Sequence, residues 1–369
     1  MTMDVSHLTV DAPEEIVAAA AQGAVFVFNI SGGKDGLCAT HAAMRFLDGL
    51  GHPRSMRYAM HADLGRTEWL ETPETVERQA AFFGLPLIVV RRPKGDLVSV
   101  WQQRYDDGLP DYDALRRVRL RGPWSGPGQK FCQPAMKRDQ FVKDLRHRFP
   151  TSRVVCVIGV RRDESRDRST AETMSTESRL STPGRTQGTN WNAIAHWTTP
   201  EVFAYARHHG LPMHEAYARW GSSRLSCALC VFSSRSDIQA TLSHDPNHAL
   251  LHTLVGMENR MGFAFQQNAW LSDARPDLLT SEELRAASAA RSYSRERRSL
   301  EALVPDAFMR SSGGVAWPWR VPDAIEAEAI AESRRLVSAW RGVPIGYVGA
   351  AAVIDRIAEQ MEDRHAIAA

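Results

Sequence analysis

The sequence predicts an α/β protein whose core is a doubly wound, mostly parallel sheet, followed by a helical C-terminal extension. Four apolar segments lack the alternation of half-exposed strands, and helical patterns separate them, at residues 25–30, 57–62, 87–90 and 154–160. Uninterrupted apolar segments are typical of parallel strands that are covered on both faces. Strands that alternate with helices imply right-handed crossovers and a doubly wound sheet. Ligands of such sheets bind beyond the carboxyl ends of the strands, so a functional site is expected there.

The pattern changes in the C-terminal part of the chain. Beyond residue 240 it becomes mostly helical, most clearly over residues 249–261 and 324–340. We therefore expect an α/β domain over residues 1–240 and a helical extension over residues 241–369. The end of this extension contains no motif that indicates a function.

Shorter segments complete the predicted organisation. Residues 1–23 predict a short amphipathic helix whose apolar side contains Ile16, Val17 and Ala20. Glycine and proline are concentrated in residues 122–128 and 178–190, and such stretches are typical of mobile loops. Because the second stretch is also long and polar, we expect it to act as a lid.

One further helix can be placed from its capping residues. Thr199 is a candidate N-cap, and Pro200 then occupies the first helical position, where its missing amide costs nothing. Trp197, just before this helix, is expected to pack in the core rather than to take part in catalysis.

The composition excludes several classes of protein. The chain has 369 residues, of which 43% are hydrophobic and 24% are charged, as in globular proteins, and its net charge is +2. So small a net charge gives no argument for a nucleic-acid partner. The five cysteines are an odd number and do not suggest a disulfide framework, so we expect a reducing, cytoplasmic setting. No signal peptide and no apolar segment of membrane-spanning length is recognisable, and we expect no membrane association.

The most informative segment follows the first apolar strand and reads Ser31-Gly32-Gly33-Lys34-Asp35-Gly36. Glycines let the backbone approach a ligand closely, and the amides of such a loop and of the next helix point toward an anion. Lys34 adds a positive charge. The segment is therefore a candidate phosphate-binding loop, although its spacing is not that of a Walker loop. The alternative is a glycine-rich turn that binds no ligand.

Charged residues follow two other predicted strands. Asp63 comes after the second strand, where a carboxylate can hold Mg²⁺ or a ribose hydroxyl, or can cap the next helix. Arg161 and Arg162 follow the fourth strand, and guanidinium groups bind phosphate oxygens through paired hydrogen bonds. Because Asp163 and Glu164 lie beside the arginines, the alternative is an ion-pair cluster on the surface.

The cysteines fall into two groups. Cys227 and Cys230 form a Cys-x-x-Cys motif, which suits a metal ion, an iron–sulfur cluster or a redox disulfide. Cys132 follows the first glycine- and proline-rich stretch and could supply a third thiolate. The alternative is three thiols that bind no metal. Cys38 and Cys156 lie within an apolar helix and strand, so they are expected to be buried small hydrophobes.

Several of these motifs, in this order, give the chain a resemblance to a known family. The loop at residues 31–35 resembles the PP-loop of adenine nucleotide alpha-hydrolase-like enzymes. Four further segments resemble motifs of phosphoadenylyl-sulfate (PAPS) reductases, at residues 61–65, 73–75, 159–166 and 192–205. Residues 225–232 and 258–263 look like segments of PAPS reductase-like proteins of phages and bacterial DNA-modification clusters. The resemblance covers about residues 20–270. Gly36 and Leu64 depart from it, since each replaces a residue with a hydroxyl group.

The resemblance implies a nucleotide site and a cofactor. The residues that it assigns to nucleotide binding are Ser31, Gly32, Gly33, Lys34, Asp35, Gly36, Asp63, Arg161 and Arg162. Lys34, Asp35 and Arg161 would be catalytic, with ATP as the nucleotide and Mg²⁺ shared with Asp35 or Asp63. Cys132, Cys227 and Cys230 would hold a [4Fe–4S] cluster. Zinc is the alternative, completed by His214 or His61.

The resemblance also implies a reaction. PP-loop enzymes react at the alpha phosphate, so we expect cleavage of ATP between the alpha and beta phosphates, with pyrophosphate release. The purpose would be to activate an acceptor for sulfur transfer or modification. Sulfonucleotide reduction is an alternative, but PAPS reductases use a C-terminal cysteine and none follows Cys230. A nucleotide-binding accessory subunit without turnover is a third interpretation, favoured by Gly36 and Leu64. The expected partners are an adenine nucleotide, a nucleic-acid acceptor and a sulfur-donor protein.

Overall fold

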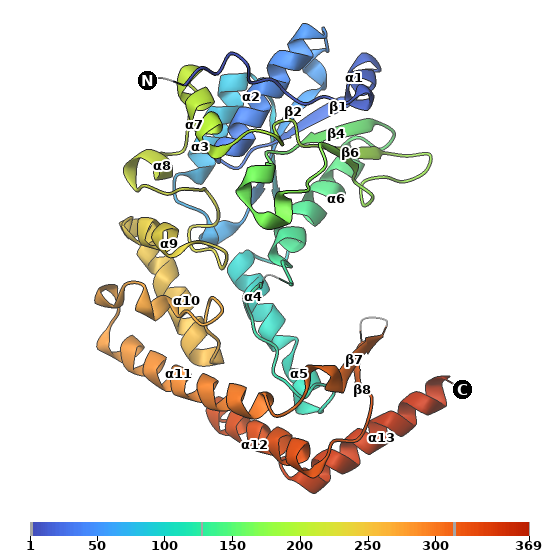
Figure 1. Ribbon diagram of the computed structural model, residues 1–369, viewed down its shortest axis with the longest axis vertical. Helices are drawn as coiled ribbons and strands as arrows, with labels where there is room; N and C mark the ends of the chain where they lie inside the picture. Colours follow the sequence, from blue (N-terminus) through green and yellow to red (C-terminus); the bar gives the residue numbers. More distant parts are fainter. Residues whose placement is uncertain (1–2, 127, 313–314, 369) are drawn as a thin grey trace. The chain divides into compact units, whose positions relative to one another are not determined.

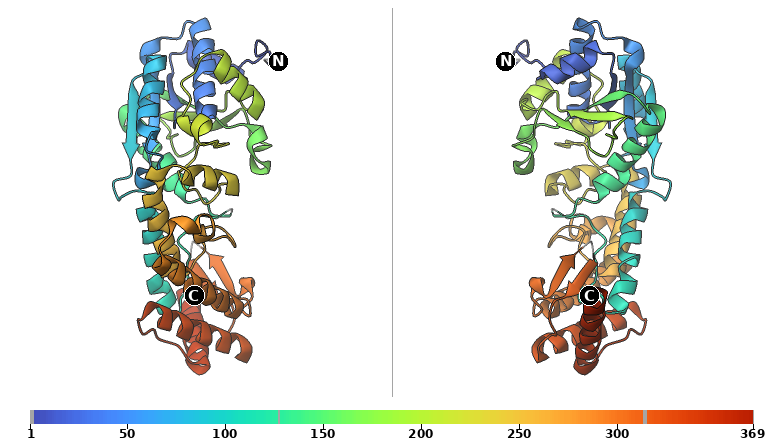
Figure 2. Two further views of the ribbon diagram at one scale, coloured as in Figure 1. Left: turned by 90° about the vertical axis from the view of Figure 1, so that its left-hand side faces the viewer. Right: turned by 90° about the vertical axis from the view of Figure 1, so that its right-hand side faces the viewer.

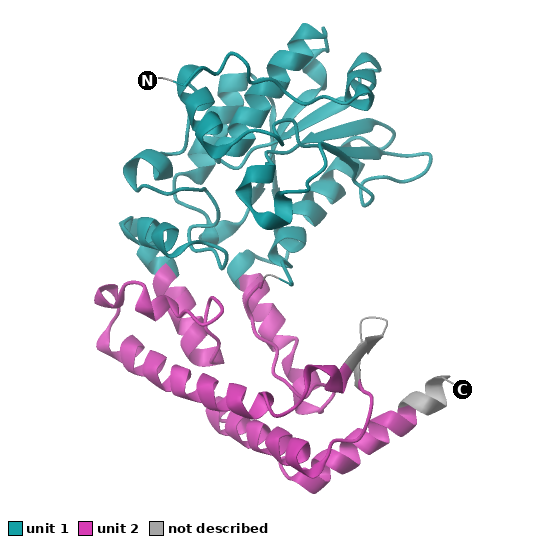
Figure 3. Cartoon of the chain, in the orientation of Figure 1, with its two compact units in different colours: residues 1–98, 127–250 teal, residues 99–126, 251–369 magenta. Residues whose placement is uncertain are grey.

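The computed structural model describes residues 3–126, 128–312 and 315–368. The chain divides into two compact units (Figure 3). Unit 1 comprises Met1–Val98 and Pro127–Leu250, and unit 2 comprises Ser99–Gly126 and Leu251–Ala369. The predicted division at residue 240 differs from this one in two ways. The change of unit comes after residue 250, and residues 99–126 belong with the C-terminal part of the chain.

Unit 1 is built on a six-stranded sheet with the strand order β3-β2-β1-β4-β6-β5 (Figure 1). Its strands are β1 (Val25–Asn29), β2 (Arg57–Asp63), β3 (Leu87–Arg91), β4 (Arg153–Val157), β5 (Met174–Thr176) and β6 (Gln187–Trp191). Neighbouring strands are parallel except for β5, which runs antiparallel to β6. The strands on the two sides of β1 wind in opposite directions, which confirms the predicted doubly wound α/β fold. Strands β1 to β4 are the four predicted ones, although β4 ends at Val157 and not at residue 160.

The helices that lie wholly within the described part of unit 1 are α1 (Glu14–Ala21), α2 (Lys34–Gly49), α3 (Thr72–Phe83), α6 (Asp139–Arg148), α7 (Thr199–His208), α8 (Glu215–Arg219) and α9 (Arg235–Leu242). Two more, α4 (Leu97–Asp106) and α10 (His248–Met261), extend from one unit into the other. The predicted N-terminal helix is α1. Its residues Ile16 and Ala20 are buried, but Val17 is 38% exposed, so the prediction that Val17 shares the apolar side is wrong.

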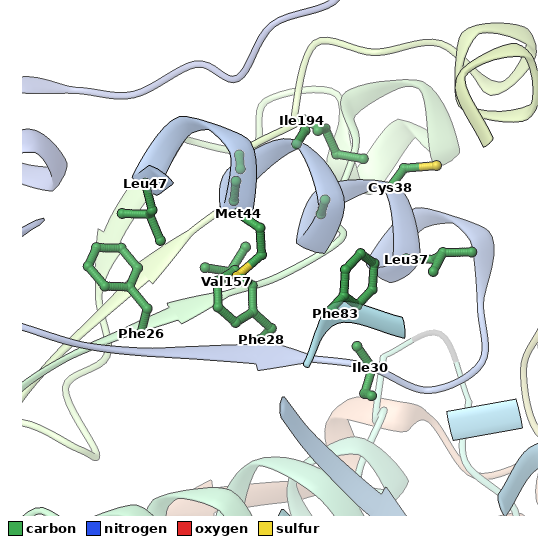
Figure 4. Packing of buried hydrophobic residues seen from close by; sticks show 14 of the residues in the cluster. Phe26, Phe28, Ile30, Leu37, Cys38, Met44, Leu47, Phe83, Val157 and Ile194 are labelled. Atoms are coloured by element: carbon green, nitrogen blue, oxygen red, sulfur yellow. The ribbon is translucent and has the colours of Figure 1, made fainter. Parts of the chain in front are cut away.

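The two faces of the sheet belong to two apolar cores, because successive residues of a strand point to opposite faces. Phe26 and Phe28 of β1 lie in a core with Leu47 of α2 (Figure 4). Val25 and Val27 alternate with these two residues along β1, and they lie in a second core with Leu145 of α6. Helices therefore cover both faces, as Figures 1 and 2 show. The uninterrupted apolar sequence of β1 follows from this double burial.

The sequence patterns did not reveal β5 and β6. Four of the five residues of β6 fall in the stretch 178–190 that was predicted to be a lid. In the structure β6 pairs with β4 and is part of the sheet, so this interpretation is wrong for residues 187–190. Leu180, in the same stretch, is fully buried and belongs to the same core as Val25 and Val27. The strand was missed because Gln187, Gly188, Thr189 and Asn190 have no apolar pattern.

Unit 2 contains the remaining helices α5 (Leu109–Asp113), α11 (Ser281–Glu301), α12 (Ala324–Arg341) and α13 (Ala350–Ala368), and the hairpin of β7 (Met309–Ser312) and β8 (Val315–Pro318). The helices predicted over residues 249–261 and 324–340 are confirmed as α10 and α12. No helix in the described ranges combines the length and the apolar character needed to cross a bilayer.

Residues 99–126 form part of the interior of unit 2. Leu115 and Val118 lie in the same apolar cluster as Ile330 of α12 and Ile357 of α13. The predicted mobile stretch 122–128 is anchored in this unit by Trp124. Its indole Nε1 donates a hydrogen bond of 3.0 Å to the Phe263 carbonyl, and its ring lies 5.0 Å from that of Phe265. Pro127, in the same stretch, lies outside the described residues.

Candidate functional site

The glycine-rich loop joins the carboxyl end of β1 to the N-terminus of α2, where the sequence predicted it. Gly32 has a φ of +78°, which favours glycine, and an added Cβ would lie 3.0 Å from Leu225 Cδ2 and 3.1 Å from His214 Cδ2. Gly33 is the N-cap of α2, and no side chain caps this helix. The first amide of α2, that of Lys34, donates to the Tyr217 hydroxyl at 2.9 Å. The next N-terminal amides of a helix without a side-chain cap are available to an anion, so the loop has the backbone geometry of a phosphate site.

Lys34 is held close to the loop rather than extended into solvent. It is only 3% exposed, and its Nζ lies 3.1 Å from Asp35 Oδ2. The same ammonium group lies 5.3 Å from the ring centre of Phe203 and 5.5 Å from that of Tyr217. Aromatic faces attract cations, so these rings help to keep the charge at the loop.

Arg161 reaches the same carboxylate from the end of β4. Its Nε donates a hydrogen bond of 2.7 Å to Asp35 Oδ1, and the residue is only 1% exposed. Its terminal nitrogens donate to the Trp197 carbonyl and to Thr199 Oγ1, both at 3.1 Å. Asp35 is thus shared between Lys34 and Arg161. The three residues predicted to be catalytic lie together and carry one net positive charge.

Gly36 is closely packed against the backbone. A Cβ at this position would lie 2.9 Å from the Asn29 carbonyl oxygen, and a Cβ at Gly159 would lie 2.4 Å from the Gly36 amide nitrogen. Both distances are too short for a side chain unless the backbone shifts. The absence of a hydroxyl group at residue 36 therefore follows from how tightly β1, α2 and the end of β4 pack in this chain.

Asp63 lies at the carboxyl end of β2, beside the loop strand β1. Its Oδ1 accepts a hydrogen bond of 2.7 Å from the Gly65 amide, and its Oδ2 accepts one of 2.8 Å from Arg91 Nε. Both oxygens thus have protein partners, and the first bond closes a local turn. It does not cap a helix, because neither the short 3-10 helix Gly65–Thr67 nor α3 has a side-chain cap. Leu64 is buried, so this position supplies an apolar contact where the resembled motif has a hydroxyl.

Arg162 differs from its neighbour Arg161. Its Nε donates to the Ala171 carbonyl at 2.9 Å, and its NH2 donates to Thr173 Oγ1 at 3.3 Å. These bonds hold the segment before β5, so Arg162 does not join the charged group at the loop.

A second correction concerns α7, whose N-cap is Thr198 and not Thr199, with Glu201 completing a capping box.

The thiols of Cys227 and Cys230 interact directly. The Cys227 thiol donates a hydrogen bond to the Cys230 sulfur, and this bond lowers the pKa of Cys230 to about 6 while it raises the pKa of Cys227. The Phe232 amide also donates to Cys230 Sγ, at 3.5 Å. The motif is attached to unit 1 through Ala228, whose amide donates to the Thr67 carbonyl at 2.7 Å. The hydrogen bond therefore favours the thiolate form of Cys230.

Cys132 interacts electrostatically with this pair. Its charge contributes to the raised pKa of Cys227, which requires that the two sulfurs be near each other. Cys132 lies two residues before a π-helical turn, Pro134–Arg138, and such turns are frequent at functional sites. Even so, the described part of the chain contains no group of three or more His, Cys, Asp or Glu side chains arranged to hold a metal ion.

The histidines named for a zinc site have other partners. His214 Nδ1 accepts a hydrogen bond of 3.0 Å from the Ala216 amide, and its Nε2 lies 3.3 Å from Thr72 Oγ1. Burial lowers the pKa of His214 to about 4. His61 is buried between the Ile30 carbonyl, 3.1 Å from its Nδ1, and the Glu68 carboxylate, 3.2 Å from its Nε2.

The other two thiols lie in apolar surroundings, as the sequence predicted. Cys38 and Cys156 are buried, in the cores on opposite faces of the sheet. Burial raises the pKa of both, that of Cys156 to about 12. Neither thiol therefore has the properties of a ligand or a nucleophile.

Tyr217, on α8, is a residue of the site that the sequence did not reveal. Its hydroxyl oxygen accepts a hydrogen bond of 2.9 Å from the Lys34 amide and one of 3.3 Å from the Leu225 amide. The phenol thus connects the phosphate-binding loop to the segment that contains Cys227. A tyrosine outside any motif gives no local signal, and only the folded chain brings it to the loop.

The sequence of this chain matches a known protein family. The sequence model of one protein family, the phosphoadenosine phosphosulfate reductase domain, matches residues 25–232, which is more than half of the chain. The chain belongs to this family. The PAPS reductase domain thus includes the loop, Arg161, all three thiols of interest and Tyr217. Among solved structures, the PAPS reductase from Candida auris, in a phosphate complex, is similar, with a TM-score of 0.37 and 14% identity over 59% of this chain and 88% of that chain. No curated protein matches the sequence.

Proposed function

We propose that this PAPS reductase-family chain binds ATP at residues 31–36 and cleaves it between the alpha and beta phosphates, which activates an acceptor for sulfur transfer. The observation that carries the proposal is the group formed by Lys34, Asp35 and Arg161 at the loop. It combines two buried cations with one carboxylate at the N-terminus of α2. Fixed positive groups that meet developing negative charge are the main source of catalysis in phosphoryl and nucleotidyl chemistry.

The roles of these residues follow from their positions. The loop amides would hold the beta and gamma phosphates, which leave together as pyrophosphate. Lys34 and Arg161 would neutralise the charge that builds up as the bond to the alpha phosphate breaks. Since Asp35 already pairs with both cations, it would orient them, and its bond to Arg161 would weaken as phosphate competes for the guanidinium group.

Magnesium is the ion expected with ATP. The two candidate carboxylates, Asp35 and Asp63, each already contact a cation, Arg161 and Arg91 respectively. A magnesium ion would therefore be held mainly by the phosphates, with Asp35 the nearer of the two carboxylates to the loop. When bound, it would supply further charge neutralisation, and the roles given above do not depend on it.

The sulfur step would take place at the cysteines. The hydrogen-bonded pair Cys227 and Cys230 provides two soft ligands, and Cys132 contributes to the raised pKa of Cys227. This donor set suits an iron–sulfur cluster better than magnesium or calcium. A [4Fe–4S] cluster held by the three thiolates would supply the site that carries sulfur to the activated acceptor. In such a cluster each thiolate binds a different iron, so the three sulfurs need not share a single metal ion.

A second candidate function, sulfonucleotide reduction, is favoured by the thiol pair itself. Their hydrogen bond lowers the pKa of Cys230 and raises that of Cys227, which makes Cys230 the better nucleophile of the two. The Cys230 sulfur would attack the sulfur of the sulfonucleotide, and the sulfur–oxygen bond would break to release the nucleotide. Cys227 would then attack the Cys230 sulfur, lose its proton to solvent and expel sulfite as the disulfide forms. A dithiol reductant would return the pair to its reduced state.

Product analysis tests these proposals. Anaerobically purified protein should convert ATP to AMP or an adenylate plus pyrophosphate, and ADP as the main product would contradict the first proposal. Sulfite release from a sulfonucleotide in the presence of a dithiol would instead support the second. Nucleotide binding without any turnover would point to an accessory subunit.

A matched pair of variants tests the loop. Lys34→Ala should remove a charged contact worth about 1.5–3 kcal/mol, so ATP affinity measured by calorimetry should fall at least about tenfold. Lys143→Ala, on α6 and away from the loop, should leave the affinity unchanged. Equal affinities for the two variants would exclude the loop as the phosphate site.

A further inference from the structure

The hydroxyl group of Tyr217 occupies an unusual position over the loop. The Tyr217 hydroxyl would lie 3.8 Å from a Cβ built on Gly33, and its oxygen accepts hydrogen bonds from the amides of Lys34 and Leu225. The ring is held edge-on against Phe203, with the ring centres 5.6 Å apart. The position of the phenol is therefore fixed from two sides, by its oxygen and by its ring.

The hydrogen-bonding capacity of this phenol is only partly used. A tyrosine hydroxyl can accept hydrogen bonds and donate one. Tyr217 accepts both of its hydrogen bonds from backbone amides, and within the described residues the hydroxyl donates none. Burial raises the pKa of Tyr217, so the phenol keeps its proton. A proton without an acceptor thus lies beside the first amides of α2.

The neighbouring Gly36 lacks a side chain that could donate a hydrogen bond, and the Tyr217 proton could take that role. The resembled loop carries a hydroxyl at that position, and here the Asn29 carbonyl oxygen, only 2.9 Å from where a Cβ would lie, leaves no room for one. The site therefore lacks a hydroxyl donor on α2 itself but has one on α8.

We propose that the Tyr217 hydroxyl donates a hydrogen bond to a phosphate of the bound nucleotide and so replaces the hydroxyl that residue 36 lacks. The inference rests on the proposed nucleotide site and adds a specific phosphate-binding residue to it. The ligand chemistry is that of a pyrophosphate group, free or as part of ATP. Since the same oxygen accepts from Leu225, phosphate bound at Tyr217 would also fix the segment that leads to Cys227.

The experiment uses inorganic pyrophosphate and ATP as probes in calorimetry with the full chain. Tyr217→Phe should lower the affinity for both by about tenfold, the effect of losing one hydrogen bond to a charged group. Tyr58→Phe, on β2 in the second core, is the matched control and should bind as the wild type does. An unchanged affinity of Tyr217→Phe would overturn the inference.

A second substitution separates donation to phosphate from mere support of the loop. Fluorination of the Tyr217 ring makes its hydroxyl a stronger donor and a weaker acceptor. At mildly acidic pH, where the fluorinated phenol stays protonated, the affinity for pyrophosphate should be equal to or higher than that of the wild type. If it falls as in Tyr217→Phe, the hydroxyl serves only to accept from the two amides and the inference is wrong. If the wild type binds neither probe, the nucleotide site itself is wrong, and the inference fails with it.

Discussion

Arg161 Nε lies 2.7 Å from Asp35 Oδ1, although the two residues are 126 positions apart in the sequence. The contact joins the loop that follows β4 to the first turn of α2, the helix that follows β1. Strands β1 and β4 are parallel neighbours in the sheet. Arg161 is almost completely buried, so its positive charge is stabilised by this carboxylate and by the oxygens of Trp197 and Thr199 instead of by water. The geometry of the loop and the stability of unit 1 are therefore linked.

The first prediction concerns Arg161→Lys. Lysine keeps the charge but cannot donate to Asp35, Trp197 and Thr199 in the fork that guanidinium provides. We expect the free energy of unfolding to fall by about 1–3 kcal/mol and ATP affinity to fall about tenfold. Urea denaturation and calorimetry measure the two effects. Arg166→Lys, at an exposed position in the same region, is the control and should change neither quantity. If Arg161→Lys also leaves both the stability and the ATP affinity unchanged, the contact with Asp35 is dispensable.

The second prediction concerns the missing hydroxyl. Gly36→Ser restores the residue of the resembled motif, yet its Cβ would lie 2.9 Å from the Asn29 carbonyl oxygen. We expect a loss of stability of about 1–3 kcal/mol, as for other overpacked sites, and no gain in nucleotide affinity. Gly49→Ser lies in the same helix with nothing within 4 Å of its Cβ and is the control for thermal denaturation. A Gly36→Ser protein as stable as this control, with tighter ATP binding, would contradict the prediction.

The third prediction is the pH dependence of thiol reactivity. Only the thiolate is alkylated, so modification of Cys230 should reach half its maximal rate near its pKa of about 6 and slow down at lower pH. Cys227→Ala removes the hydrogen bond that stabilises the Cys230 thiolate, so the midpoint should move upward, toward the ordinary value of 9.0. Peptide mass spectrometry after brief iodoacetamide treatment measures each site. Buried Cys38 and Cys156 serve as internal controls that stay unmodified. A wild-type midpoint near the ordinary value would show that the pair does not interact in solution.

The fourth prediction concerns the metal. Protein reconstituted anaerobically with iron and sulfide should be brown, and Cys132→Ala, Cys227→Ala and Cys230→Ala should each lose most of the bound iron. Cys38→Ala and Cys156→Ala should keep it, because both thiols are buried in apolar cores. Iron and sulfide analyses together with absorbance spectra measure the outcome. Cys132→Ala protein that retains the iron content of the wild type would remove Cys132 from the ligand set.

The sequence predicted those parts of the fold and site that have a local signal. Uninterrupted apolar segments revealed β1 to β4, and the glycines with Lys34 revealed the loop. β6 was missed because its first four residues have no apolar pattern, and its place in the sheet depends on pairing with β4 and β5. Arg162 has the same residue type and neighbourhood as Arg161, and only the folded backbone decides which of the two reaches Asp35. Tyr217 could not be predicted, since its role depends on where α8 packs.

The segment 99–126 has a consequence for any shortened version of the protein. The polypeptide passes from unit 1 to unit 2 and back before it enters unit 2 a second time. A fragment that ends at residue 250 would retain Leu115 and Val118 but lack Ile330 and Ile357, which share their apolar cluster. Such a fragment should expose apolar surface and aggregate. During synthesis, too, this segment leaves the ribosome long before α12 and α13 are made. Its apolar side chains therefore stay exposed to solvent until the chain is nearly complete.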